Sequence, residues 1–119
     1  MNSREMILEI LLEIEEGEHS HVAIRNALSK YQFLPKQDRA FITRVCEGTL
    51  EYRIQIDYII NSFSKVTVDK MKPAIREILR SAVYQLKYMD SVPDSAVCNE
   101  AVKLAQRKGF YNLKPFVNG

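Results

Sequence analysis

Few side chains in this sequence combine the types and the spacing that enzyme chemistry or metal binding requires. The two cysteines, Cys46 and Cys98, are each isolated within an apolar helical pattern and form no spacing typical of metal or redox sites. We interpret both as buried thiols. His19 and His21 are two positions apart, and residues so spaced point to different sides of a helix, which argues against a shared metal ion. The sequence therefore predicts neither a catalytic site nor a metal site in this chain.

Positive charge gathers at the carboxyl-terminal end, and this feature could attract an anionic partner. From Ala101 onward the chain has four basic side chains and no acidic one, whereas its first eighteen residues hold six glutamates against Arg4. The formal net charge of +2 is too small to indicate nucleic acid by itself, but a segregated distribution can still steer an anion. Ordinary solvated helix faces remain the alternative for any single cluster. The basic residues are Lys103, Arg107, Lys108 and Lys114.

Helical periodicity dominates the chain and predicts the elements that position these charges. Apolar residues cover most of the circumference of a first helix over about 3–16, so we expect this helix near the centre of the domain, with Ser3 as its cap. A long helical region after Pro35 changes phase near Tyr52, which predicts two helices or one bent helix. Further helices are expected over about 20–31 and 70–88, between Ser91 and Gly109, and from about Asn112, where the last helix is truncated.

Gly48 interrupts an apolar helical stripe, at a cost of about 1 kcal/mol relative to alanine. We interpret it as a packing residue, where another helix crosses close to its backbone. No stretch alternates between apolar and polar residues with period two, so no sheet is expected. The predicted fold class is therefore all-α, a compact bundle of about six to seven helices.

The composition is that of one globular domain over residues 1–119. Of the 119 residues, 46% are hydrophobic and 27% are charged, which is enough to build a real core. No apolar run has the length of a membrane span, and the first residues lack the pattern of a signal peptide, so we expect a cytoplasmic protein. The apolar pattern continues up to Gly119 without a charged tail, which predicts a piece of a longer protein.

Several short motifs occur in an order that is typical of one family. They are Arg80 to Leu86, Val92-Pro93, Asn99 to Val102 and Phe116 to Gly119. Together they resemble the C-terminal half of the NusB-like helical fold. Asp38 to Phe41 and Glu47 to Leu50 resemble the version of this fold at the N-terminus of RsmB (Sun/Fmu) type 16S rRNA cytosine-5 methyltransferases. The resemblance covers essentially the whole chain.

The resemblance implies a non-catalytic, all-α RNA-binding domain that precedes a catalytic domain using S-adenosylmethionine. Enzymes of that class use one cysteine in a Pro-Cys context and a second in a Thr-Cys context. Neither context is present, because Cys46 follows Val45 and Cys98 follows Val97, and no glycine-rich turn for the cofactor is present either. The expected partners are RNA, in particular 16S rRNA, and the missing C-terminal catalytic domain, with no cofactor, metal or membrane bound by this piece.

The resemblance also implies where RNA is bound. Arg4 matches a contact position at the N-terminus, and Asn112 and Phe116 match positions in the last helix. A helix N-terminus offers N–H groups to phosphate, and an aromatic ring can stack on an unpaired base. Lys108 and Lys114 would add contacts to the RNA backbone. The alternative for Phe116 is a place in the core, and the glutamates of the first helix disfavour phosphate along much of that helix.

Arg80, Asn99 and Glu100 form the structural part of the motif. We expect Glu100 to pair with Arg80 or Arg76 between packed helices, and such pairs are more often structural than catalytic. Two other functions stay open. One is a stand-alone NusB-type antitermination factor that binds leader RNA together with a ribosomal protein. The other is a protein docking module without RNA affinity, in which the apolar first helix packs on the absent domain.

Overall fold

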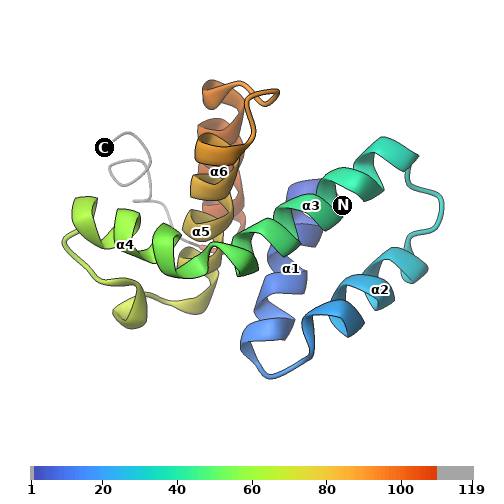
Figure 1. Cartoon of the computed structure of the whole chain (residues 1–119), viewed down its shortest axis with the longest axis horizontal. Coiled ribbons are helices and arrows are strands. Elements are labelled where there is room, and N and C mark those ends of the chain that lie inside the picture. The colour runs from blue at the N-terminus through green and yellow to red at the C-terminus, as the bar shows by residue number, and fades with distance from the viewer. Residues whose placement is uncertain (1, 110–119) are drawn as a thin grey trace.

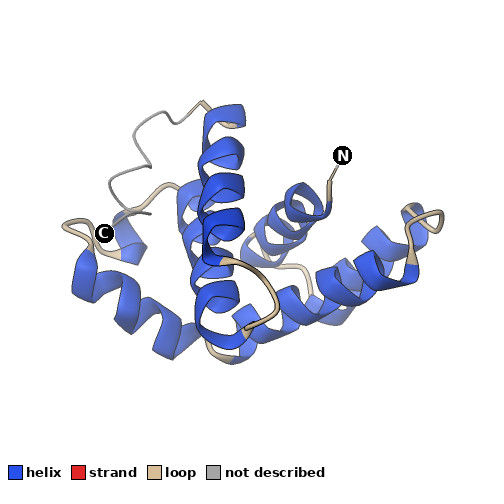
Figure 2. Cartoon of the chain, turned by 90° about the horizontal axis from the view of Figure 1, so that it is seen from above, coloured by secondary structure: helices blue, strands red, loops and turns tan. Residues whose placement is uncertain are grey.

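A computed structural model describes residues 2–109 of the chain. These residues form six α-helices and one short 3₁₀ turn, with no strand among them. Figures 1 and 2 show how the helices are arranged. The elements are α1 (Ser3–Glu15), α2 (Ser20–Lys30), α3 (Lys36–Glu51), α4 (Arg53–Phe63), η1 (Val68–Lys70), α5 (Pro73–Tyr88) and α6 (Asp94–Arg107). The predicted all-α fold is confirmed, while the helix predicted from about Asn112 lies outside the described residues.

Helix α1 lies at the centre of the bundle, where it packs against α2, α3, α5 and α6. The central position predicted from its apolar run is confirmed. Asn2, and not the expected Ser3, caps the helix, because its Oδ1 accepts the N–H of Glu5 at 2.9 Å and leaves Ser3 as the first helical residue. Gly17 follows the helix with a φ of +119°, a conformation that favours glycine. The buried residues of α1 are Met6, Ile7, Leu8, Ile10 and Leu11.

The long helical region after Pro35 is divided into α3 and α4, which meet at Tyr52, so the predicted change of phase is confirmed as two helices. Helix α5 packs against α1, α3, α4 and α6. It therefore connects the N-terminal helix of the domain to helix α6. It crosses α3 at Gly48, where a Cβ atom would lie 2.0 Å from Cζ of Tyr84. The close approach predicted at Gly48 is confirmed. None of the helices within residues 2–109 is long and apolar enough to cross a lipid bilayer.

The two cysteines differ in their environment. Cys46 on α3 is completely buried in the core, whereas Cys98 on α6 is half-buried. The expectation of two buried thiols is therefore correct for Cys46 and only partly correct for Cys98.

Burial, reinforced by the carboxylate of Glu47, raises the pKa of Cys46 to about 12. At pH 8 only about one in 10⁴ of its thiols is ionised, and the thiolate is the nucleophile. We therefore expect iodoacetamide at pH 8 to leave Cys46 unmodified in the folded chain while it alkylates the chain unfolded in urea, as measured by peptide mass spectrometry. Equal rates of alkylation in both states would contradict this prediction.

Candidate nucleic-acid interface

The carboxyl-terminal end of α6 presents basic side chains to solvent. Arg107 pairs with Glu5 of α1, and Lys103 Nζ lies 3.7 Å from Oε1 of Glu100 on the same helix. Lys108, which follows the helix, is exposed and forms no salt bridge with any of residues 2–109. Lys108 is therefore a predicted RNA contact whose charge is available to a ligand. The predicted contacts Asn112, Lys114 and Phe116 lie outside the described residues.

Arg4 on α1 is held against the domain and is only half-exposed. Its Nε donates a hydrogen bond of 3.2 Å to Oε1 of Gln85 on α5, and its guanidinium carbon lies 5.3 Å from the centre of the Phe41 ring. Burial lowers the pKa of Arg4, while the carboxylate of Glu100 raises it. Because arginine stays protonated in proteins, Arg4 is a partly desolvated positive charge close to α6.

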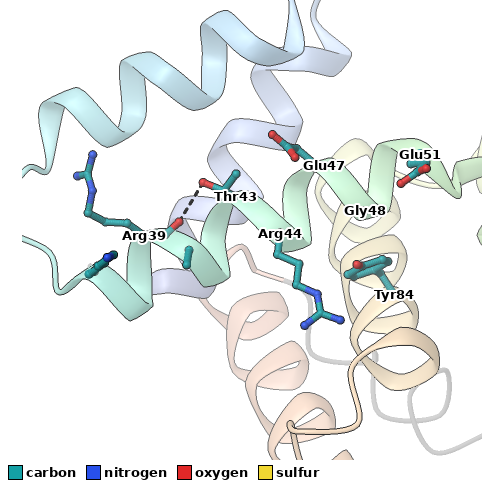
Figure 3. Close-up of a pocket in the computed structure, with 9 residues that line it drawn as sticks. Arg39, Thr43, Arg44, Glu47, Gly48, Glu51 and Tyr84 are labelled. Atoms are coloured by element: carbon teal, nitrogen blue, oxygen red, sulfur yellow. Dashed lines mark hydrogen bonds between the residues drawn. The ribbon is translucent and has the colours of Figure 1, made fainter.

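A shallow groove of about 560 Å³ lies along the exposed side of α3 (Figure 3). Lys36 and Arg39 line the part of the groove near the start of the helix, Arg44 lines its middle, and Glu47 and Glu51 line the part near its end. Positive side chains at the beginning of a helix and negative ones at its end oppose the helix dipole. This arrangement does not stabilise α3, and its mixed charge does not mark a phosphate-binding surface.

The two arginines that line this groove bind neighbouring helices. Arg39 Nη1 donates to the carbonyl oxygen of Leu28 at 2.8 Å, and Arg44 Nη2 donates to the carbonyl oxygen of Tyr88 at 3.2 Å. Both carbonyls belong to the last turn of a helix, where intrahelical donors are missing. The two side chains therefore cap α2 and α5, and their first role is structural.

Three tyrosines gather beside the groove. The rings of Tyr52 and Tyr88 are stacked with their centres 4.5 Å apart, and those of Tyr84 and Tyr88 are 5.3 Å apart. This cluster is not apparent from the sequence. Tyr84 and Tyr88 are one helical turn apart, which is a weak signal, but Tyr52 reaches them only because α3 crosses α5. Tyr84 is buried and Tyr88 is half-buried, so the cluster is mainly a packing element.

Arg80 of α5 lies at the centre of a network of charged groups between α4 and α5. Its Nε and Nη2 donate to the two carboxylate oxygens of Asp57 at 2.7 and 2.8 Å, and its Nη1 donates to Glu77 at 2.8 Å. Glu77 is only 4% exposed. Burial raises the pKa of Glu77, and the neighbouring charge and hydrogen bond of Arg80 oppose that rise. The motif residue Arg80 therefore has a structural role.

The expected pairing of Glu100 with Arg80 or Arg76 is wrong. Arg80 faces α4 and not α6, and Arg76 pairs with Glu15 at the end of α1. Glu100 instead lies beside the lysine one turn further along α6. Asn99, the other motif residue of α6, is exposed.

Residues 2–109 contain no group of three or more His, Cys, Asp or Glu side chains that could hold a metal ion. The expectation that His19 and His21 point to different sides of a helix is wrong, because His19 precedes α2. Their rings are stacked with centres 6.1 Å apart.

Comparison with known proteins identifies relatives of two kinds. The profile of the NusB family matches residues 1–119. A probable ribosomal RNA small subunit methyltransferase B of Bacillus subtilis (strain 168) is 32% identical over 116 residues, which are 98% of this chain and 26% of that protein. The transcription antitermination protein NusB of Bacillus velezensis is 33% identical over 118 residues, which are 98% of this chain and 88% of that protein.

A solved structure has the same fold. In a crystal structure of antitermination factors NusB and NusE in complex with dsRNA, one chain superposes with a TM-score of 0.83 at 20% sequence identity, over 98% of this chain and 88% of that chain. The chain spans about a quarter of the length of the methyltransferases that it matches. The match of the family profile over the full length, together with the antitermination relative, shows that the chain belongs to the NusB family.

Proposed function

We propose that this chain is the non-catalytic, RNA-binding N-terminal domain of an S-adenosylmethionine-dependent 16S rRNA cytosine-5 methyltransferase of the cytoplasm. One observation carries the proposal: nearly the whole chain aligns with only 26% and 27% of the methyltransferases of B. subtilis and Synechocystis. In this proposal the remainder of the protein binds the cofactor and performs the methylation. The present domain contributes affinity for rRNA and holds the substrate near the catalytic site.

The exposed cations near the carboxyl-terminal end act on the RNA backbone. Lys108 has no salt-bridge partner within residues 2–109, so its charge is available to phosphate. Lys114 adds a second charge, Asn112 a hydrogen bond and Phe116 a stacking surface for an unpaired base. Arg4 supplies a further positive charge from α1. Because phosphate contacts release counterions, this mode of binding weakens steeply as salt rises.

A double charge reversal tests this surface. We expect Lys108→Glu with Lys114→Glu to weaken binding of 16S rRNA at least tenfold at low salt and to lower the salt slope by about 1 to 2, measured by filter binding at several KCl concentrations. Lys65→Glu with Lys70→Glu is the matched control, because it makes the same change of charge at exposed positions near η1. Equal losses in the two variants, or unchanged affinity at low salt, would contradict the assigned surface.

The methyltransferase part of the proposal is tested by the genomic reading frame after Gly119. A long continuation that carries the Pro-Cys motif would support it. A stop codon within a few helical turns would contradict it and favour a stand-alone factor.

A second function has its own support, since the chain spans 88% of the B. velezensis antitermination protein. In that case the chain would bind leader RNA together with a ribosomal protein. Titration with NusE, the protein present in the related dsRNA complex, distinguishes the two proposals. Formation of a ternary complex of chain, NusE and leader RNA would favour antitermination. A chain that binds neither RNA nor NusE would instead be a protein docking module.

A further inference from the structure

We infer that Gln85 and Phe41 are positioning residues for Arg4, which they hold with its two Nη groups directed at an RNA phosphate. The inference rests on the proposed RNA-binding function and deepens it. The side chain of Arg4 is then already ordered before RNA binds.

The amide of Gln85 is oriented from inside the bundle. The side chain is only 3% exposed, and its Nε2 donates to the carbonyl oxygen of Ser81 at 3.1 Å, one turn earlier on α5. This bond directs the amide oxygen away from the backbone of α5 and toward α1. The reverse orientation of the amide would place its NH₂ group against the Nε–H of Arg4, donor against donor. Gln85 therefore presents a fixed acceptor to Arg4.

The guanidinium of Arg4 is restrained on two sides. Oε1 of Gln85 accepts the Nε–H at 3.2 Å, and the ring of Phe41 lies 5.3 Å from the guanidinium carbon. These contacts use the Nε–H and the face of the group. Neither Nη atom donates to any of residues 2–109. The two Nη groups therefore keep N–H donors that can bind a phosphate in a bidentate manner.

The positive charge of Arg4 has no paired carboxylate among residues 2–109. Arg4 is half-buried, and the carboxylate of Glu100 on α6 raises its pKa without forming a salt bridge with it. A partly desolvated charge interacts more strongly with phosphate than a fully hydrated one. A side chain that is already ordered also loses less conformational freedom on binding. Removal of the restraint should therefore cost about three- to tenfold in affinity.

The same contact also joins α1 to α5, so a loss of affinity in one variant would not separate positioning from stability. A double-mutant cycle separates them. The four proteins are the wild-type chain, Arg4→Met, Gln85→Met and the double variant, each titrated with transcribed 16S rRNA by filter binding at two KCl concentrations after a thermal melt has shown that it is folded. Phe41→Leu provides an independent variant, because it removes the ring on α3 and leaves the hydrogen bond intact.

We expect Arg4→Met to weaken binding and to lower the salt slope by about 1. Gln85→Met should weaken binding about three- to tenfold with an unchanged slope, since the charge stays, and it should have no effect in the Arg4→Met background. Phe41→Leu should behave as Gln85→Met does.

Two results would overturn the inference. One is a loss from Gln85→Met that is equal in both backgrounds, since Gln85 would then act only on the fold. The other is RNA binding by the wild-type chain that Arg4→Met does not change. If the wild-type chain does not bind 16S rRNA at all, the proposed function itself fails, which is a different outcome. Should Gln85→Met not fold, the cycle of Phe41→Leu with Arg4→Met decides in the same way.

Discussion

Replacement of Arg80 by methionine is expected to lower the free energy of unfolding by about 3 kcal/mol, because it leaves a buried carboxylate without its partner. Glu77 and Arg80 have side chains only 5% and 12% exposed, and Arg80 also holds both oxygens of Asp57. Methionine keeps most of the volume, so the loss reports the charge and its hydrogen bonds. Urea denaturation followed by circular dichroism measures the change.

Lys103→Met is the matched control for this experiment. It removes a cation from a pair with Glu100 whose atoms are 3.7 Å apart, but Lys103 is 60% exposed. Pairs exposed to this degree contribute about 0 to 1 kcal/mol. Similar losses in the two variants would show that burial of Glu77 has no energetic importance.

The pH dependence of the Arg80→Met variant provides a second readout of the same effect. Burial already raises the pKa of Glu77 above its ordinary value, and the loss of Arg80 removes the influence that opposes this rise. The folded variant then binds a proton that the unfolded chain does not bind, over the range from the unfolded pKa of about 4.3 up to the raised folded pKa. Its deficit relative to wild type should therefore shrink as the pH falls from 7 toward 5. A constant deficit over this range would contradict the assignment to Glu77.

The helices of this domain could be predicted from the sequence because each has a strong local signal. The apolar run of α1 indicates burial on most sides, and the break of phase at Tyr52 separates α3 from α4. The first and last residues of each helix were harder to predict, since neighbouring residues can both be suitable as the cap. Asn2 and Ser3 are both good caps, and only the hydrogen bond to the N–H of Glu5 decides between them.

The partners of the charged residues could not be predicted in the same way. The sequence places Arg80 on a helix, but whether it faces Asp57 of α4 or Glu100 of α6 depends on how the helices cross. The contact of Arg4 with Gln85 joins residues 81 positions apart, for which no local pattern exists. The sequence could indicate only the excess of positive charge toward the carboxyl-terminal end. The exposed Lys108 at the end of α6 agrees with it.

A methyl group at Gly48 is expected to have the second large effect on stability. Alanine is the better helix former by about 1 kcal/mol, so propensity alone predicts that Gly48→Ala stabilises α3. The structure predicts the opposite, because the new Cβ would lie 2.0 Å from Cζ and 2.4 Å from the hydroxyl oxygen of Tyr84. That ring is buried and lies against Tyr88, so it cannot swing away freely. We expect Gly48→Ala to lower the free energy of unfolding by about 2 kcal/mol.

The effect of Gly48→Ala on stability should change sign when the ring of Tyr84 is removed. In a Tyr84→Ala background, Gly48→Ala meets no ring and should raise the free energy of unfolding by up to about 1 kcal/mol, as helix propensity dictates. Urea denaturation of the four proteins gives both values, and Ala40→Gly at an exposed position of α3 calibrates the propensity term. If Gly48→Ala destabilises both backgrounds equally, the constraint at this position does not come from Tyr84. A reversal would establish that Gly48 is required by the crossing of α3 and α5 and by no other property of α3.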